Sequence, residues 1–186
     1  MKTICLVVGH DRSTMGAINY LSEYEYEFNR RIALKVKHKL VRIKQDNIKL
    51  VVCTKVNGKP YFLEQGDIFF LVELHFNSFN GVVHGAESLV QADSPLKNMF
   101  VGPIKMFHET LVVLLGVKDR GIKRITRGER GYANLEQYKH QPFKVDNSMI
   151  WEPCFGSDTY GNRKIFEAED LYVDKLVRVL MMIGNL

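Results

Sequence analysis

Two short apolar runs constrain the fold of this chain more than any other feature. The first, Thr3–Val8, is continuous and ends at Gly9, and the second, Ile68–Leu74, is broken only by Glu73 and ends at His75. Runs of this kind are typical of strands that are buried on both faces, as parallel strands in the middle of a sheet are. The first run therefore predicts a buried central strand, and the segment Asp67–Asn77 around the second run contains the strongest predicted strand, Ile68–His75.

Helical and extended segments alternate along the rest of the chain. Apolar residues at four-residue steps predict an amphipathic helix over Glu23–Arg42. Further strands are predicted over Lys49–Thr54, Gly81–Gln91 and Asn147–Trp151, a turn at Asn57-Gly58, and helices over Pro95–Leu115, with a kink at Gly102-Pro103, and over Ala168–Ile183. This alternation predicts an α/β fold with a mostly parallel central sheet flanked by helices on both faces.

The bulk properties favour one soluble domain. The length of 186 residues suits a single domain spanning 1–186, and the three widely spaced cysteines indicate reduced thiols and not a disulfide framework. The apolar run near the N-terminus is too short for a signal peptide or a transmembrane helix. We therefore expect a protein that is made in the cytoplasm, has no transmembrane segment and is a monomer.

The formal net charge of +5 favours an anionic partner, although a solvated basic surface explains it equally well. Nucleic acid is one such partner, a membrane face another and an anionic polymer a third. The lysines and arginines are dispersed, and no RNA-binding, helix-turn-helix or zinc-finger pattern is present. Nucleic-acid binding is therefore not expected.

Four residues that can bind a metal or transfer a proton lie at the ends of predicted elements. His10, His75 and Glu152 follow predicted strands, and Glu25 lies at the start of the first helix. Groups at the carboxyl ends of parallel strands meet at one edge of the sheet. Two imidazoles and a carboxylate are a normal ligand set for catalytic zinc, and a second carboxylate can then take a proton from water. Taken singly, each residue also has a structural explanation, such as the helix dipole for Glu25.

Several motifs resemble those of one enzyme family in their residues and in their order along the chain. The motifs are Val7–His10 with Gly16-Ala17, Glu25–Ala33, Glu73–Ser78, Gly81–Glu87, Asp119–Lys123 and Met149–Asp158. Together they resemble the zinc-dependent N-acetylmuramoyl-L-alanine amidases of the amidase type 3 family, over nearly the whole chain. The resemblance implies hydrolysis of the amide that joins N-acetylmuramic acid to L-alanine in peptidoglycan.

The resemblance also implies a role for each site residue. His10, Glu25 and His75 are the implied ligands of a zinc ion (Zn2+), and Glu152 is the implied catalytic base. Glu23 remains an alternative ligand, since the phase of the helix does not exclude it. Two positions depart from the family pattern: Asp11 and Glu73 stand where the family usually has glycine and serine.

These features lead to an expectation for the whole protein. It is a single catalytic amidase domain without a separate cell-wall-binding domain, similar to a phage endolysin, and it acts on the cell wall. A zinc peptidase that cuts the stem peptide or a crosslink is the nearest alternative, and a basic nucleic-acid-binding module is the alternative from a different class. Among the remaining polar residues, Asn77 is expected to cap the loop after its strand, and His38, His108 and His140 are expected on helix or loop surfaces.

Overall fold

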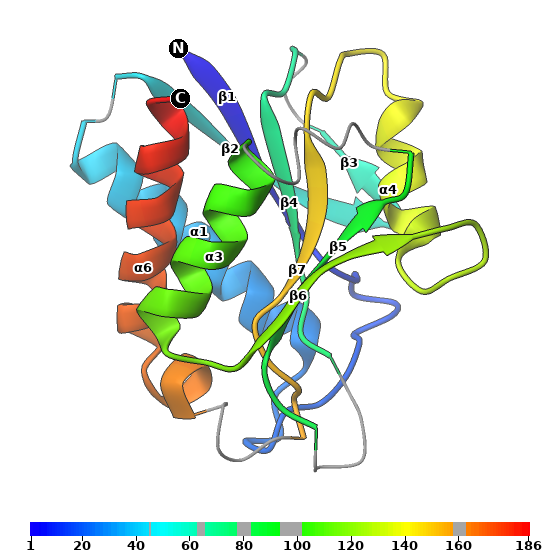
Figure 1. Cartoon of the computed structure of the whole chain (residues 1–186), viewed down its shortest axis with the longest axis vertical. Coiled ribbons are helices and arrows are strands. Elements are labelled where there is room, and N and C mark those ends of the chain that lie inside the picture. The colour runs from blue at the N-terminus through cyan, green and yellow to red at the C-terminus, as the bar shows by residue number, and fades with distance from the viewer. Residues whose placement is uncertain (45, 63–65, 78–82, 94–101, 158–162) are drawn as a thin grey trace.

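The computed structural model describes residues 1–44, 46–62, 66–77, 83–93, 102–157 and 163–186. These residues form one sheet of seven strands in the order β3-β2-β1-β4-β7-β5-β6 (Figure 1). The strands are β1 (Lys2–Val8), β2 (Ile48–Val56), β3 (Lys59–Tyr61), β4 (Phe70–Leu74), β5 (Ala86–Gln91), β6 (Asp119–Ile125) and β7 (Ser148–Glu152).

The centre of the sheet is parallel and its margins are mixed. Strands β2, β1, β4 and β7 run parallel to one another, whereas β3 is antiparallel to β2. On the other side β5 is antiparallel to β7, and β6 is parallel to β5. The carboxyl ends of β1, β4 and β7 therefore lie at one edge, the lower edge in Figure 1.

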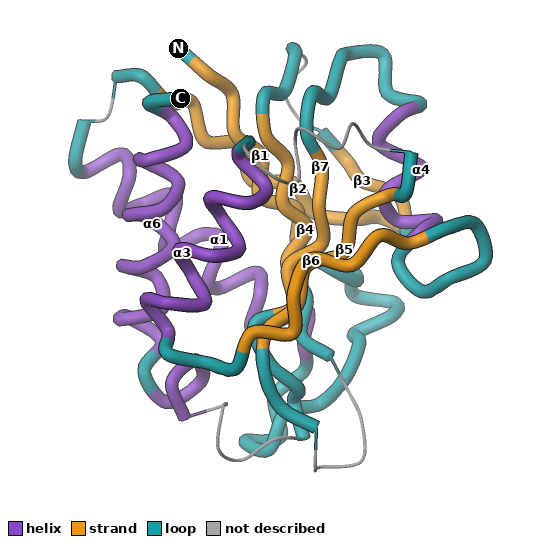
Figure 2. The backbone as a smooth tube through the Cα atoms, viewed as in Figure 1, coloured by secondary structure: helices purple, strands orange, loops and turns teal. Residues whose placement is uncertain are grey.

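Helices cover both faces of the sheet, so the predicted α/β architecture is confirmed (Figure 2). One face carries α1 (Glu25–Arg42), α3 (Pro103–Leu115) and α6 (Glu169–Gly184), and a short π-helix, η1 (Arg163–Glu167), precedes α6. The other face carries α4 (Tyr132–Lys139). Each face has its own apolar core: α1, α3 and α6 pack on the larger one, and Leu135 and Tyr138 of α4 pack on the smaller one.

Strand β4 shows how the sheet divides its side chains between these two cores. Phe70, Val72 and Leu74 belong to the larger core, and Leu71 belongs to the smaller core. Because side chains alternate along a strand, Glu73 points to the same face as Leu71. The register places Glu73 in one row with Val7 of β1 and Ile150 of β7, so this carboxylate lies in the interior beneath α4.

The predicted elements are found with small differences at their ends. The first helix begins at Glu25, two residues later than predicted, and its apolar face at four-residue steps is buried. Pro103 is the first residue of α3, so the predicted kink is the start of the helix, which Gly116 ends with a positive φ of 59°. Residues 95–101 of that predicted helix and residues 81–82 of a predicted strand lie outside the described residues.

Two elements beside the site were not predicted as such. Strand β6 contains the motif Asp119–Lys123, for which the sequence predicts no strand, and no helix is predicted over the residues of α4. His108 was placed on a surface, but it is buried: its Nδ1 lies 2.8 Å from Ser88 Oγ and its Nε2 lies 2.8 Å from Asp119 Oδ1. In the described part of the chain, the helices are too short or too polar to cross a membrane.

Candidate active site

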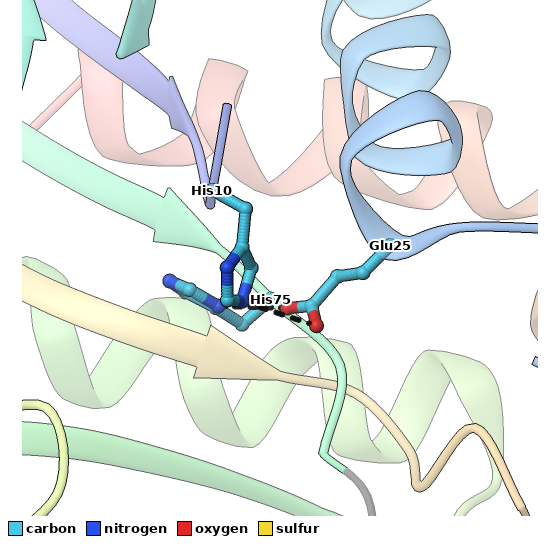
Figure 3. A group of neighbouring side chains, drawn as sticks. All are labelled: His10, Glu25 and His75. Atoms are coloured by element: carbon cyan, nitrogen blue, oxygen red, sulfur yellow. Dashed lines mark hydrogen bonds and ion pairs between the residues drawn. The ribbon is translucent and has the colours of Figure 1, made fainter. Parts of the chain in front are cut away.

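Three side chains with metal-binding atoms meet at the carboxyl edge of the sheet (Figure 3). His10 follows β1 through Gly9, His75 directly follows β4, and Glu25 is the first residue of α1. Each of the three offers one ligand atom, and these atoms lie within 4.8 Å of one another. Because β1 and β4 are parallel neighbours, their ends bring the two imidazoles together, with ring centroids 5.0 Å apart.

Two glycines make this close approach possible. A Cβ atom on Gly9 would lie 2.4 Å from the carbonyl oxygen of Leu74 and within 2.7 Å of the His75 ring. A Cβ atom on Gly16, where φ is +78°, would lie 2.6 Å from the His10 ring and 2.7 Å from a Glu25 carboxylate oxygen. Both positions therefore require glycine for steric reasons.

The loop after His10 is closed by the side chain of Asp11. One oxygen of Asp11 accepts hydrogen bonds from the backbone N–H groups of Ser13 (2.8 Å) and Thr14 (3.0 Å). The other oxygen accepts one from the N–H of Gly58 (2.6 Å) in the β2–β3 turn. These bonds stabilise a tight turn in which His10 adopts a positive φ of 65°, an uncommon conformation for a residue with a side chain.

The buried carboxylate of Glu25 joins the two histidines. Its Oε2 lies 3.3 Å from His10 Nε2, and its Oε1 lies 2.7 Å from His75 Nδ1. The backbone N–H groups of Ala17 and Phe76 donate to the same carboxylate. Burial would raise the pKa of Glu25, but the hydrogen bonds from the histidines outweigh it and lower the pKa to about 2. Glu25 is therefore ionised, and a positive charge beside it stabilises this buried carboxylate.

His75 lies between two carboxylates. Its Nδ1 contacts Glu25 Oε1, and its Nε2 lies 2.7 Å from Glu73 Oε1. Burial would lower the pKa of His75, but the hydrogen bonds with Glu25 and Glu73 raise it to about 10. The position between these acids therefore stabilises a cation strongly.

The donor set fits a zinc ion. Two imidazoles and one carboxylate are a normal ligand set for catalytic zinc, and His10, Glu25 and His75 would hold the ion, since their ligand atoms lie within 4.8 Å of one another. A histidine that binds a metal usually gives its other N–H group to a carboxylate. The contact between His75 Nε2 and Glu73 meets that condition.

The end of β7 adds a second carboxylate to the site. Glu152 is 3% exposed and forms an ion pair through both of its oxygens with the guanidinium of Arg130, in which Nη2 to Oε2 is 2.8 Å. Asn77 Nδ2 donates to the same Oε2 at 2.9 Å. Burial raises the pKa of Glu152 above its ordinary value, although Arg130 opposes the shift. A carboxylate with a raised pKa is suited to accept a proton.

Glu87 of β5 lies directly across the sheet from Glu152 as its register partner. Like charges in this position repel each other, and three cations compensate. Arg120 and Lys123 of β6 and Arg130 all form ion pairs with Glu87. The hydrogen bonds from Lys123 and Arg120 outweigh burial and lower the pKa of Glu87, so the proton affinity of the pair resides on Glu152.

Asn77 was expected to cap the loop after its strand, whose residues 78–82 lie outside the described residues, and its side chain also contacts the acids of the site. Its Nδ2 donates both to Glu87 Oε1 (3.1 Å) and to Glu152 Oε2 (2.9 Å). It therefore lies between the two acids and holds them in place. The backbone of Asn77 does pair with the segment after β7, since its N–H donates to the carbonyl oxygen of Cys154.

A cavity of about 500 Å³ connects the metal-binding group with Glu152. His10, Glu25, His75 and Glu152 line it, so the structure brings all four predicted site residues to one place. Glu23, the alternative ligand, forms an ion pair with Arg31 and is not part of this group.

The residues that sequence reasoning missed are the partners of the four. Glu73, Glu87 and Arg130 hold the site residues, and they come from different elements. One signal was present for Glu73: a charged residue inside the strongest apolar run requires a buried partner.

Comparison with known proteins identifies the fold. No protein-family model matches the sequence, and no curated protein matches it by sequence. Among solved structures, the chain is similar to an N-acetylmuramoyl-L-alanine amidase from Clostridium difficile 630, with a TM-score of 0.71 and 20% identity, covering 99% of this chain and 94% of that one.

Two catalytic domains show the same similarity. For that of CwlV, an N-acetylmuramoyl-L-alanine amidase from Bacillus (Paenibacillus) polymyxa var. colistinus, the TM-score is 0.67 and the identity 18%, covering 100% of this chain and 96% of that one. For the CD27L endolysin, which targets Clostridia difficile, the values are 0.66 and 19%, covering 100% and 98%. At these identities the similarity establishes a shared fold.

Proposed function

We propose that this chain is a zinc-dependent N-acetylmuramoyl-L-alanine amidase, which hydrolyses the amide between N-acetylmuramic acid and L-alanine in peptidoglycan. The observation that carries the proposal is the group of His10, Glu25 and His75 at the carboxyl edge of the sheet, with Glu152 lining the same cavity. The fold shared with amidase structures supports the same reaction. The proposed zinc ligands are His10, Glu25 and His75.

The protein's own residues hold the metal, transfer the proton and orient the proposed base. Zinc, when bound, supplies Lewis-acid chemistry, which lowers the pKa of water and polarises the scissile carbonyl. Glu152 accepts the proton of the attacking water on its carboxylate and passes it to the leaving nitrogen of L-alanine. Asn77 and Arg130 orient that carboxylate, and burial keeps its proton affinity high.

A lytic role of the endolysin type, with residues 1–186 as one catalytic domain, is part of this proposal. Similarity to the CD27L endolysin catalytic domain supports it. The net charge of +5 suits the anionic polymers of a cell wall, because opposite charge raises the local concentration of the enzyme on its substrate.

The direct test is the chemistry of the products. Purified chain with bound zinc is incubated with peptidoglycan, and the products are identified by mass spectrometry. New L-alanine amino termini on intact stem peptides are the expected result, and EDTA should abolish their release until zinc is restored. Cleavage inside the stem peptide would instead identify a peptidase, and no cleavage would contradict the proposal.

The ligand set has its own test, which uses neighbouring glutamates of the same helix region. Glu25→Ala should lose zinc, because it removes the carboxylate that joins both histidines. Glu23→Ala is the matched control, since Glu23 pairs with Arg31 outside the group, and it should keep zinc. Zinc content after dialysis decides between the two; loss of zinc from Glu23→Ala alone would refute the assignment.

A further inference from the structure

Glu73 is the most completely buried acid next to the site, and the proposed mechanism gives it no part. Its side chain is 0% exposed and lies on the α4 face of the sheet. A carboxylate in such a place is costly unless every oxygen is paired. Both oxygens of Glu73 therefore require hydrogen-bond donors or cations as partners.

Four groups lie within hydrogen-bond distance of this one carboxylate: one from β2, two from α4 and the ring of His75, which directly follows β4. Lys55 of β2 forms a buried ion pair with Oε1, and Asn134 Nδ2 of α4 donates to Oε1 at 2.8 Å. Tyr138 OH, also of α4, donates to Oε2 at 2.6 Å. The fourth partner is Nε2 of His75, 2.7 Å from Oε1.

This arrangement fixes the position of the His75 ring. Without a metal, each ring nitrogen of His75 faces a carboxylate, which favours an imidazolium with two N–H groups. A histidine that binds a metal through Nδ1 keeps one N–H group, on Nε2, and in this site that group faces Glu73, while Nδ1 points to the group with His10 and Glu25. Because Lys55, Asn134 and Tyr138 hold Glu73 from two directions, the ring cannot turn without breaking buried hydrogen bonds.

We propose that Glu73 is a positioning residue, whose carboxylate binds Nε2–H of His75 and so presents Nδ1 to the metal. This inference rests on the zinc site of the proposed function. It assigns a purpose to the departure from the family's serine, and it explains why Lys55 and α4 reach the same buried oxygen atoms.

The test measures zinc binding and not activity. Removing Glu73 alone would leave Lys55 charged and buried, so the variant Glu73→Leu/Lys55→Met removes both charges together. Its zinc affinity, measured by competition with a chelator, is expected to fall about 10- to 100-fold. Glu73→Gln/Lys55→Met keeps an acceptor for Nε2–H and should recover most of the affinity. Val72→Ala, on the opposite face of β4, is the control for lost stability and should bind zinc as the wild type does.

A second readout distinguishes positioning from packing. In zinc-loaded protein labelled with ¹⁵N at histidine, the wild type and the Gln variant should show a slowly exchanging Nε2–H proton on His75, and the Leu variant should lose it. Unchanged affinity in the Leu variant, a fall equal to that of Val72→Ala, or an Nε2–H signal that survives would each overturn the proposal. A wild type that binds zinc but does not cleave peptidoglycan would contradict the proposed function and leave this inference standing.

Discussion

At the scale of single residues, Glu152 differs from the proposed ligands in one measurable way. It lines the cavity but hydrogen-bonds to Arg130 and Asn77, and it is not one of the three residues whose ligand atoms converge. A base can be removed without removing the metal, whereas a ligand cannot. This contrast gives the first prediction.

Glu152→Gln should fold, keep about one zinc ion per chain and lose turnover by about 10²- to 10⁴-fold. The amide keeps the size of the side chain and can still accept from Asn77, but it cannot take a proton from water. Zinc content and the release of L-alanine amino termini are measured on the same sample. A variant that retains more than about a tenth of its activity would show that Glu152 is not the base.

The glycine at position 16 permits a second comparison at this scale. Gly16→Ala and Gly58→Ala both place a side chain at positive φ, +78° and +74°, and each should lose roughly 1 kcal/mol of stability. Only at Gly16 does the new Cβ meet His10 and Glu25, since nothing lies within 4 Å of a Cβ at Gly58. Zinc affinity should therefore fall roughly tenfold or more in Gly16→Ala alone. Equal affinities in a chelator competition would contradict this.

The four candidate residues could be predicted from sequence because each lies at an end of a recognisable element. A histidine at the end of a central apolar run must lie at the edge of the sheet, and parallel strands share that edge. Their partners could not be predicted in this way. Glu87 faces Glu152 only because β5 runs antiparallel to β7. The register of such a pair cannot be inferred from the sequence of either strand alone.

At the scale of elements, α4 shows why some short helices cannot be predicted from the sequence. Its eight residues carry only two buried apolar side chains, Leu135 and Tyr138, and Gly131 before it adopts a positive φ of 85°. A short helix with so narrow an apolar face has no clear period. Tertiary contacts stabilise α4 instead. Gly131 lies against Ile150, and Asn134 and Tyr138 of the helix donate hydrogen bonds to Glu73.

Strand β6 was missed for a related reason. Its sequence, Asp119–Ile125, is polar, and most of its side chains are only partly buried because it is the edge strand beside β5. Arg120 and Lys123 face the acids of the site. The charges that make this strand hard to predict are therefore the ones that compensate Glu87 and lower its pKa, so that Glu152 has the higher pKa of the two acids.

The segment that leads into α4 also sets the pH dependence of the proposed base. Arg130 lowers the pKa of Glu152 against the effect of burial. Arg130→Met should therefore raise that pKa, and because the base works when it is deprotonated, the acidic limb of the kcat/KM profile should move to higher pH. Lys139→Met, at the other end of α4 and paired with Asp93, is the matched control and should leave the profile in place. A limb that stays still or moves to lower pH in Arg130→Met would contradict the assignment.

At the scale of the whole molecule, apolar packing and not surface charge joins the helices to the sheet. Helices α1 and α6 share the ion pairs of Arg31 with Glu169, Lys35 with Asp170 and Lys39 with Asp174. Most of these side chains are substantially exposed, and such pairs contribute about 0–1 kcal/mol each. The buried rows of Phe28, Ile32 and Val36 against the sheet contribute more, at about 1.5–3 kcal/mol for each large side chain.

Zinc should add to this stability, since its proposed ligands come from three segments far apart in sequence. His10, Glu25 and His75 converge only when β1, β4 and α1 are assembled, so the folded chain binds the ion far better than the unfolded chain does. Free zinc at a hundred times its Kd should stabilise the fold by about 2.7 kcal/mol, which for a chain of this size raises Tm by roughly 5 to 10 °C. Melting curves recorded with EDTA and with graded zinc measure the shift. His75→Ala should fold with a Tm that zinc does not change, because it lacks a ligand while keeping the apolar cores. Should zinc raise the Tm of that variant as much as that of the wild type, the stabilising ion binds elsewhere, and the three converging side chains are not its ligands.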